Sequence, residues 1–408
     1  MYKLTGKVQH YAWGGTAYIP ALLGINNTAQ QPYAEYWMGA HNSNPSIVQW
    51  NENKGMALNE LIKEDAPEWL GEKVARQFGE LPYLFKVLDV KDMLSIQVHP
   101  SKAEAEKGFA RENEAGIPLN APHRNYKDDN HKPEVMLALS EFWLLHGFKE
   151  KKLLLQTLQQ TEAFKILLPV FEKEGYYGLY KQVMELPQAT VNGMLGPLLH
   201  QSEPLYKANQ LSKSDPAYWA CKTVTSHNGN YTGIDRGIFS IYFFNLVQLH
   251  PGQAIFQGAG VPHAYLEGQN IELMSNSDNV LRGGLTPKHI DVPELLKHTL
   301  FEGIVPQIMN GEEKGAETVY HCPVPDFEVS KIMPDKQTTY RHTAFSAEIL
   351  LIAEGEADMA TPVQTLHLKK GESVLVGAAE TYTISTDTRA VLYKAGVPKQ
   401  NATVNHKP

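Results

Sequence analysis

The sequence predicts a mainly β protein that is interrupted by one helical insertion. Runs rich in β-branched and aromatic residues, broken by Pro, Gly and Asn, fill most of residues 1–148 and return after residue 226. Between these stretches the apolar residues change to helical spacing, as in KKLLLQTLQQTEAFKILL. At 408 residues the chain is also too long for one ordinary hydrophobic core, so two or three domains are expected.

The expected strands include PYLFKVLDV, LSIQVH and EVMLALSEFWLLHGF. In the insertion, Asp215 and Pro216 form a cap and first-turn pair before AYWACKTV. The apolar run IFSIYFFNLVQL is about half the length of a membrane span and carries polar residues, so we expect a buried strand. The expected domains are residues 1–148 with 227–320, the helical insertion 149–226, and a C-terminal β-domain 321–408.

Composition and charge limit the possible partners. The chain is 42% hydrophobic and 20% charged, with a formal net charge of −8, which argues against a nucleic-acid binder or an anionic-membrane binder. Its N-terminus does not resemble a signal peptide, and Cys221 and Cys322 lack metal-type spacing. We therefore expect a cytoplasmic protein with reduced cysteines, and a monomer that binds a small molecule.

Four potential metal ligands lie beside strand-like runs: Gln97 and His99 in LSIQVHPSK, Glu134 in NHKPEVMLAL, and His263 in GAGVPHAYLEG. Neutral donors with one carboxylate suit a divalent ion at an open, catalytic site. Gln97 and His99 are two residues apart on a predicted strand, so they project from one face. Pro133 favours an extended backbone before it, which would place Lys132 on the same face as Glu134.

Basic residues occur in the same segments, although the chain as a whole is acidic. A metal beside several cations suggests an anionic, most simply phosphorylated, substrate. The basic residues concerned are Lys86, Lys102, Lys132, Arg282 and Lys288.

Two stretches of the chain share a glycine spacing. Gly252 is followed at +6, +8 and +11 by Gly258, Gly260 and His263, and Gly371 is followed at the same intervals by Gly377, Ala379 and Tyr382. The spacing resembles the second cupin motif, with Tyr382 at the position of the metal histidine in the second copy. The resemblance implies tandem cupin-like jelly rolls with a metal site in the first barrel only.

Longer blocks resemble the type I mannose-6-phosphate isomerase (phosphomannose isomerase) family. They are YAWGG, AEYWMGAH, PYLFKVLDVKDMLSIQVHPSK, YKDDNHKPE and HAYLEGQNIELMSNSDNVLRGGLTPKHID. The resemblance implies one Zn²⁺ per chain, bound by Gln97, His99, Glu134 and His263. It also implies interconversion of mannose 6-phosphate and fructose 6-phosphate through a cis-enediol, feeding GDP-mannose metabolism.

The resemblance also gives candidate catalytic residues. Arg282 would stabilise the developing enediolate charge, or else pair with Asp278. The general base stays open among Lys132, Glu272 and Asp278, in that order, and His131 would either relay protons or pack its loop.

The phosphate site has its own candidates. Thr286 and Pro287 predict a helix start, so free backbone N–H groups and Lys288 would bind an anion. The resemblance adds Ser95 as a phosphate contact. Lys86 interrupts an apolar strand, so it is expected to be an active-site wall cation or a partner of an acid such as Asp89.

Two other functions remain possible from the residues. An iron-dependent cupin dioxygenase could use His99, Glu134 and His263, but it would not need the basic cluster. A non-catalytic sugar-phosphate sensor would keep the metal and ligand sites. The sequence does not separate zinc from manganese or cobalt.

Overall fold

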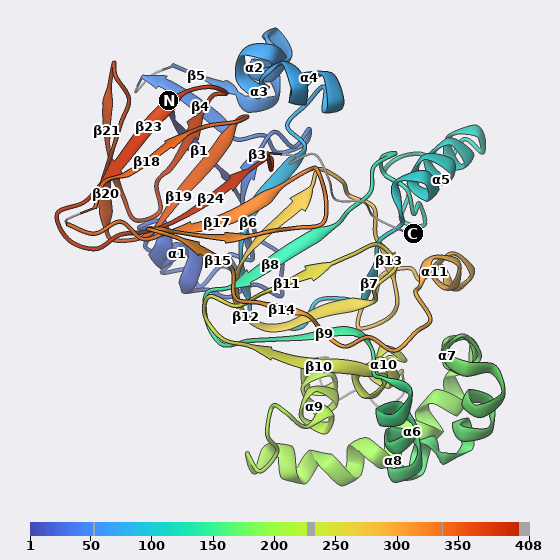
Figure 1. Ribbon diagram of the computed structural model, residues 1–408. Coiled ribbons are helices and arrows are strands. Elements are labelled where there is room, and N and C mark those ends of the chain that lie inside the picture. The colour runs from blue at the N-terminus through green and yellow to red at the C-terminus, as the bar shows by residue number, and fades with distance from the viewer. Residues whose placement is uncertain (52–53, 227–232, 337, 400–408) are drawn as a thin grey trace.

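The computed structural model describes residues 1–51, 54–226, 233–336 and 338–399. The fold is mainly β-sheet with helices around it (Figure 1), as the sequence predicted. The predicted boundary at residue 227 and the predicted end of the C-terminal domain at residue 408 lie outside the described residues. The domain limits therefore stay a prediction.

One sheet, here called the site sheet, joins segments from both sides of the helical stretch. Its main path runs β14-β11-β8-β12-β6-β3-β2, and β7, β9, β10 and β13 pair beside it. The long strand β12 lies at its centre because it pairs antiparallel with both β6 and β8. The strands are β2 (Lys7–Gln9), β3 (Glu35–Gly39), β6 (Tyr83–Val90), β7 (Gln97–Val98), β8 (Glu134–Ala138), β9 (Phe142–Phe148), β10 (Phe244–Leu249), β11 (Ala254–Gln257), β12 (His263–Ser275), β13 (Leu281–Arg282) and β14 (Ile308–Met309).

A second sheet holds most of the C-terminal strands and three from the N-terminal end. Its order is β15-β16-β17-β24-β19-β22-β1-β4-β5, and β18-β23-β20-β21 form a third sheet. Antiparallel pairing of Tyr2 in β1 with Leu375 in β22 joins the N-terminal strand to the C-terminal strands. The strands are β1 (Tyr2–Thr5), β4 (Ile47–Asn51), β5 (Lys54–Ala57), β15 (Glu312–Lys314), β16 (Glu317–Tyr320), β17 (Glu328–Ile332), β18 (Tyr340–Thr343), β19 (Glu348–Glu354), β20 (Glu356–Ala360), β21 (Thr365–Lys369), β22 (Ser373–Val376), β23 (Thr381–Ser385) and β24 (Val391–Gly396).

A continuous hydrophobic core packs the C-terminal strands against the site sheet. Phe85 and Val87 of β6 belong to the same buried cluster as Ile349 of β19. The Tyr83 hydroxyl donates to the carbonyl oxygens of Ala347 at 3.0 Å and Ala395 at 3.1 Å. The C-terminal region is thus fixed relative to the strands that carry the candidate site.

In Figure 1, α2–α4 lie near β4 and β5, α6–α9 lie below β9 and β10, and α5 and α11 lie to the right of the site sheet. The predicted helical stretch is confirmed, and Asp215 accepts the Ala217 N–H at 2.9 Å at its expected cap. The helices are α1 (Tyr18–Leu22), α2 (Leu58–Glu64), α3 (Ala66–Leu70), α4 (Glu72–Phe78), α5 (Lys102–Glu114), α6 (Lys151–Gln160), the 3₁₀ helix η1 (Glu162–Leu167), α7 (Leu168–Glu185), α8 (Gln188–Lys207), α9 (Pro216–Ser226), α10 (Gly237–Phe243) and α11 (Val292–His298).

The prediction of one buried strand over IFSIYFFNLVQL is wrong in its first half. Residues Gly237–Phe243 form α10, all of them buried, and the strand begins at Phe244. The rings of Phe239 and Phe243 pack against Phe164 of η1, with centroids 5.6 Å away in each case. A short, uniformly apolar run has no periodicity that separates a buried helix from a buried strand.

No helix of the described residues is long and apolar enough to cross a membrane.

Candidate metal centre

Strand pairing brings the predicted metal ligands together inside the site sheet. Gln97 of β7 lies opposite both His263 and Arg282 in the strand register. Glu134 opens β8, and His99 follows β7 directly. One potential ligand atom each from His99, Glu134 and His263 lies within 4.8 Å of the others, and all three residues are buried.

Both histidines are oriented by backbone carbonyls. His99 Nδ1 lies 2.8 Å from the Asn279 oxygen, and His263 Nδ1 lies 2.9 Å from the Val261 oxygen. A carbonyl only accepts, so each Nδ1 carries the proton and each Nε2 keeps its lone pair. The Nε2 atoms approach Glu134 at 3.4 Å and 3.3 Å, and that of His99 is buried without a hydrogen-bond partner. Such orientation by second partners is typical of metal-binding histidines.

The protonation states also suit a cation. Burial lowers the pKa of His99 to about 4, and this outweighs the opposing effect of Glu134. Burial raises the pKa of Glu134, but Lys132 and the two histidines outweigh it and hold that pKa well below the usual value. The site therefore offers neutral imidazole and ionised carboxylate at neutral pH, which are the forms that bind metals.

Two lysine ammonium groups lie among the buried carboxylates of the site. The Lys132 ammonium lies 3.0 Å from Glu134, as predicted, and the Lys86 ammonium lies 3.0 Å from Glu272 and 3.6 Å from Glu35. Three buried carboxylates, Glu134, Glu272 and Glu35, lie beside these two ammonium groups. The Glu134 carboxylate also faces the Nε2 atoms of both histidines, so it is the acid best placed to hold a cation together with them.

Lys86 does not pair with Asp89, which was one alternative from the sequence. Asp89 instead accepts from the Gln269 side chain at 2.7 Å and from the Tyr18 N–H at 3.3 Å. The Lys86 ammonium also lies over the Trp37 ring, 5.1 Å from its centroid. Lys86 is thus a buried cation in the wall beside the metal ligands.

Arg282 and Lys288 form a cationic edge next to β7. Neither side chain has an ion-pair partner within the part of the chain that the structure describes. Burial, followed by the neighbouring Arg282, lowers the pKa of Lys288, so the two cations are close enough to repel. Ser95 lies at the same edge, because the backbone of Ile96 bonds to Gly283 at 2.9 Å and Gly284 at 3.0 Å.

The predicted helix start at Thr286 and Pro287 is wrong. Thr286 Oγ1 accepts the Lys288 N–H at 3.2 Å within a turn, and α11 begins only at Val292. Its N-cap is Asp291, which accepts the Glu294 N–H at 3.1 Å. Both positions have a capping residue followed by proline: Thr286 is followed directly by Pro287, and Asp291 is followed two residues later by Pro293. Local capping signals alone therefore did not separate the two positions.

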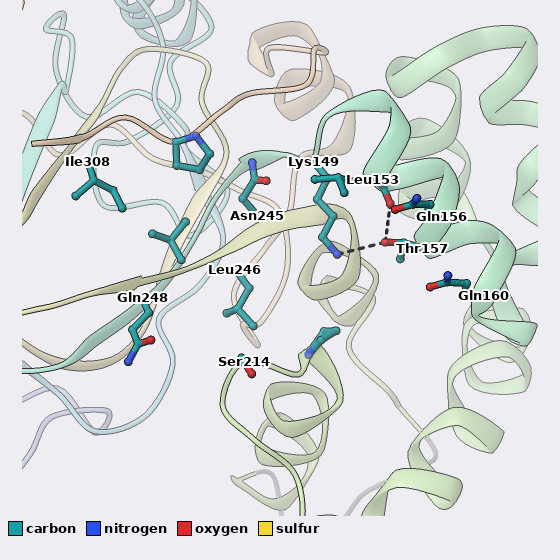
Figure 2. Close-up of a pocket in the computed structure, with 13 residues that line it drawn as sticks. Lys149, Leu153, Gln156, Thr157, Gln160, Ser214, Asn245, Leu246, Gln248 and Ile308 are labelled. Atoms are coloured by element: carbon teal, nitrogen blue, oxygen red, sulfur yellow. Dashed lines mark hydrogen bonds between the residues drawn. The ribbon is translucent and has the colours of Figure 1, made fainter.

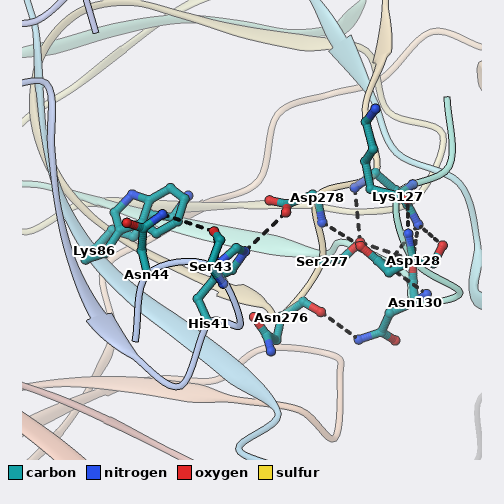
Figure 3. A network of polar contacts seen from close by, with 12 residues as sticks. His41, Ser43, Asn44, Lys86, Lys127, Asp128, Asn130, Asn276, Ser277 and Asp278 are labelled. Carbon is teal, nitrogen blue, oxygen red and sulfur yellow. Dashed lines mark hydrogen bonds and ion pairs between the residues drawn. The ribbon is translucent and has the colours of Figure 1, made fainter. Parts of the chain in front are cut away.

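Asp278 pairs with His41 rather than with Arg282. His41 Nε2 lies 3.2 Å from the Asp278 carboxylate, as Figure 3 shows. Burial raises the pKa of Asp278, but the His41 hydrogen bond and the nearby Lys132 and Lys86 outweigh it, so the net shift is downward. The neighbouring Ser277 hydroxyl donates to Asp128 at 2.7 Å, which fixes this loop to residues 128–130.

Glu272 and His131, two other predicted catalytic residues, have very different surroundings. Glu272 is buried beside Lys86, and burial, despite Lys86, raises its pKa above the usual value. His131 turns away from the three metal ligands, and its Nε2 lies 2.9 Å from Asp326 of the C-terminal region. The Lys132 ammonium lies 3.0 Å from Glu134.

A separate cleft of about 600 Å³ lies between α6 and β10 and contains none of the predicted site residues. Figure 2 shows Lys149 on its wall, hydrogen-bonded to Thr157 at 3.3 Å. The predicted chemistry therefore belongs to the site sheet and not to this cleft.

Sequence reasoning missed several residues that shape the site. Glu35, His41, Asn279 and Asp326 were not among the predicted site residues. Asn279 holds His99 through its carbonyl and also binds residues 127–130 through its side chain. The block AEYWMGAH contains Glu35 and His41, and MSNSDNV contains Asn279, so the family blocks were the signal that could have found them.

The fold and site are those of a mainly β protein in which a buried histidine–carboxylate group that could hold a metal ion lies in the same sheet as Arg282, a cation without an ion-pair partner among the described residues. Residues 1–151 match the family model for the catalytic domain of type I phosphomannose isomerase. The mannose-6-phosphate isomerase of Escherichia coli (strain K12) is 41% identical over 392 residues, covering 93% of this chain and 95% of the relative. That of Homo sapiens is 35% identical over 418 residues, covering 94% and 95%. The chain belongs to the phosphomannose isomerase family.

Solved structures agree with this assignment. A mannose 6-phosphate isomerase from Salmonella typhimurium, bound to its substrate fructose 6-phosphate and to zinc, superimposes with a TM-score of 0.86 at 38% sequence identity. The match covers 97% of this chain and 99% of that one. A mannose 6-phosphate isomerase bound with zinc and yttrium gives the same TM-score and identity.

Proposed function

We propose that this chain is a zinc-dependent aldose–ketose isomerase that interconverts mannose 6-phosphate and fructose 6-phosphate. The observation that carries the proposal is the buried His99–Glu134–His263 group, whose Nε2 atoms converge on one carboxylate. The relatives that match this chain over 95% of their own length are named mannose-6-phosphate isomerase. The protein would act in the cytoplasm, as a monomer, in the supply of GDP-mannose.

The residues present fit one zinc ion per chain. His99, Glu134 and His263 would hold it, with Gln97 as a fourth ligand from β7. The buried Nε2 of His99 has no hydrogen-bond partner and lies within reach of Glu134 and His263, which favours a bound cation. Bound zinc would act as a Lewis acid toward the sugar oxygens, worth several kcal/mol of transition-state stabilisation.

The reaction moves a proton between C2 of the aldose and C1 of the ketose. A base must remove the carbon proton, and charge develops on the enediolate oxygen until a proton moves between O1 and O2. Arg282 would stabilise that charge, because its guanidinium is unpaired and lies one strand from Gln97. His131 is held by Asp326, so of its two predicted roles, proton relay or loop packing, the proposal takes loop packing.

Lys132 and Glu272 are the leading candidates for the base. Lys132 lies nearest to the metal ligands and would be placed at the reacting carbons. Burial raises the pKa of Glu272 above its usual value, which makes it a stronger base than an ordinary carboxylate, but it also accepts from Lys86 at 3.0 Å. Asp278 has a lowered pKa, which makes it a weaker base.

The substrate phosphate would bind at the edge formed by Ser95, Arg282 and Lys288. Two cations without protein partners can neutralise a dianion at little desolvation cost to other ion pairs. Lys86 stays an active-site wall cation. This placement leaves the sugar between the phosphate edge and the metal ligands.

The tandem cupin-like architecture, with one metal site, is part of the proposal. Gly252 and Gly371 both have a positive φ, of 88° and 86°, and so do Gly260 and Ala379, at 78° and 62°. Left-handed backbone at the same two positions supports a repeated turn–strand–turn unit, since non-glycine residues such as Ala379 rarely adopt it. The domains would be residues 1–148 with 227–320, 149–226, and 321–408.

The direct test is turnover. Purified, zinc-loaded protein is incubated with mannose 6-phosphate while fructose 6-phosphate is followed, with and without a chelator. The proposal expects turnover that the chelator abolishes and added zinc restores, and a His263→Ala variant without activity. Tight substrate binding without turnover at full zinc occupancy would contradict it and favour a sugar-phosphate sensor.

A further inference from the structure

Asp326 is a buried carboxylate from outside the site sheet that contacts the site from the C-terminal region. It lies between β16 and β17 and is 2% exposed. Its Oδ1 atom accepts from Ser275 Oγ at 2.8 Å and lies 2.9 Å from His131 Nε2. The proposed reaction does not use this acid directly, since its contacts are with His131 and Ser275.

The two partners of Asp326 bracket the start of β8. His131 comes two residues before Pro133 in the segment that carries Lys132 and Glu134. Ser275 ends β12, and its N–H donates to the Pro133 oxygen at 3.1 Å. Asp326 therefore links the end of β12 to the segment just before β8, whose first residue is Glu134.

The segment 131–133 has no strand ladder of its own, because β8 pairing begins at Glu134. Two side-chain contacts hold this segment instead. The Lys132 ammonium contacts Glu134, and the His131 imidazole contacts Asp326. Fixing His131 thus limits how far the backbone at Lys132 can turn. A misplacement of about 1 Å in a catalytic group can reduce a rate about 100-fold.

We propose that Asp326 is a positioning residue: through His131 and Ser275, the C-terminal region holds Lys132 and Glu134 in the geometry that isomerisation requires. This inference rests on the proposed function. It assigns the C-terminal region a part in catalysis without a metal site of its own.

The test compares Asp326→Asn with Asp358→Asn. The asparagine keeps the shape of the Asp326 side chain but removes the negative charge that faces His131. Asp358 makes an Asp–His pair of the same length, 2.9 Å to His367, on the exposed surface of the C-terminal region, so it is the matched control. With saturating zinc, kcat of Asp326→Asn should fall about 10-fold or more, while KM changes less than about threefold because the phosphate edge is untouched.

A double-mutant cycle separates positioning from a general loss of structure. If Asp326 acts in part through His131, Asp326→Asn should cost less in a His131→Gln background than in the wild type. Zinc affinity, measured by competition with a fluorescent chelator, should weaken about 10-fold, because Glu134 loses support. Unchanged kcat and zinc affinity, or fully additive effects in the cycle, would overturn the inference.

Turnover by the wild-type protein separates a failure of the positioning role from a failure of the proposed function. No turnover by the wild type contradicts the proposed function, and the zinc-affinity ratio between Asp326→Asn and wild type still tests the positioning of Glu134. Turnover by the wild type with an equally active Asp326→Asn contradicts the positioning role alone.

Discussion

Replacing Lys86 by methionine should destabilise the protein strongly and make its stability depend on pH. The Lys86 ammonium lies 3.0 Å from Glu272 and 3.6 Å from Glu35, and the side chains of Lys86 and Glu272 are 7% and 5% exposed. Removing one partner of a buried pair leaves an uncompensated charge and typically costs about 3–5 kcal/mol. Methionine fills a similar volume, so the loss would come mainly from charge and not from a cavity.

Proton uptake should reduce this cost at low pH. Burial raises the pKa of Glu272 even with Lys86 present, and nearby Glu134 and Glu35 raise it further. Without Lys86 the pKa rises again, so the folded variant would bind a proton that the unfolded chain releases. A folded pKa above the unfolded one gives stability that is present at low pH and is lost as pH rises through the folded pKa. The destabilisation should therefore be larger at pH 8 than at pH 6.

The assay is urea unfolding of metal-free protein, followed by tryptophan fluorescence at both pH values. Lys3→Met is the matched control, since Lys3 lies 2.6 Å from Glu372 but the two side chains are 38% and 37% exposed. An exposed pair is worth about 0–1 kcal/mol, so this variant should unfold close to wild type. If Lys86→Met were no less stable than Lys3→Met, or equally stable at pH 6 and pH 8, the reasoning about the buried charges would be refuted.

Three more predictions concern zinc, histidine and phosphate. Chelation should lower the melting temperature and added zinc should restore it, because at a thousandfold excess over its Kd a ligand stabilises by about 4 kcal/mol; an unchanged melting temperature would argue against a bound ion. Burial lowers the pKa of His146 to about 4, so metal-free protein should lose up to about 3 kcal/mol as pH falls from 6.5 toward that pKa, and His146→Gln should lose less in the same urea titration. Arg282→Gln should lower kcat/KM for mannose 6-phosphate about 100-fold or more, whereas Lys102→Gln, an exposed lysine paired with Glu106 and Asp129, should stay near wild type; equal losses would remove Arg282 from the site.

Local patterns in the sequence predicted which candidate metal ligands share a strand face. The two-residue spacing of Gln97 and His99 and the proline after Lys132 both follow from backbone geometry. The structure confirms the pairing of Lys132 with Glu134. What local patterns could not give is the distance in space between His99 and His263, which comes from the pairing of β7 with β12.

Long-range partners explain most of what the sequence left open. Lys86 was recognised as a buried cation that needs an acid, but its partners Glu272 and Glu35 come from neighbouring strands and not from its own. Asp326 contacts His131 across 195 residues of chain. Such contacts depend on strand register and sheet packing, which one sequence without an alignment does not specify.

In the second stretch with the shared glycine spacing, hydrogen bonds satisfy a buried carboxylate. Tyr382 stands where the first copy has His263, and its hydroxyl donates to Glu348 at 2.7 Å. The same carboxylate lies 2.9 Å from His342 Nε2, so this buried acid already has two partners. In the first copy, by contrast, the Nε2 atom of His99 has no hydrogen-bond partner. A satisfied polar group gains little from a cation, whereas an unsatisfied one gains much. Glu348 therefore gains less from a cation than the His99 group does, which agrees with the proposal of one metal site in the first stretch.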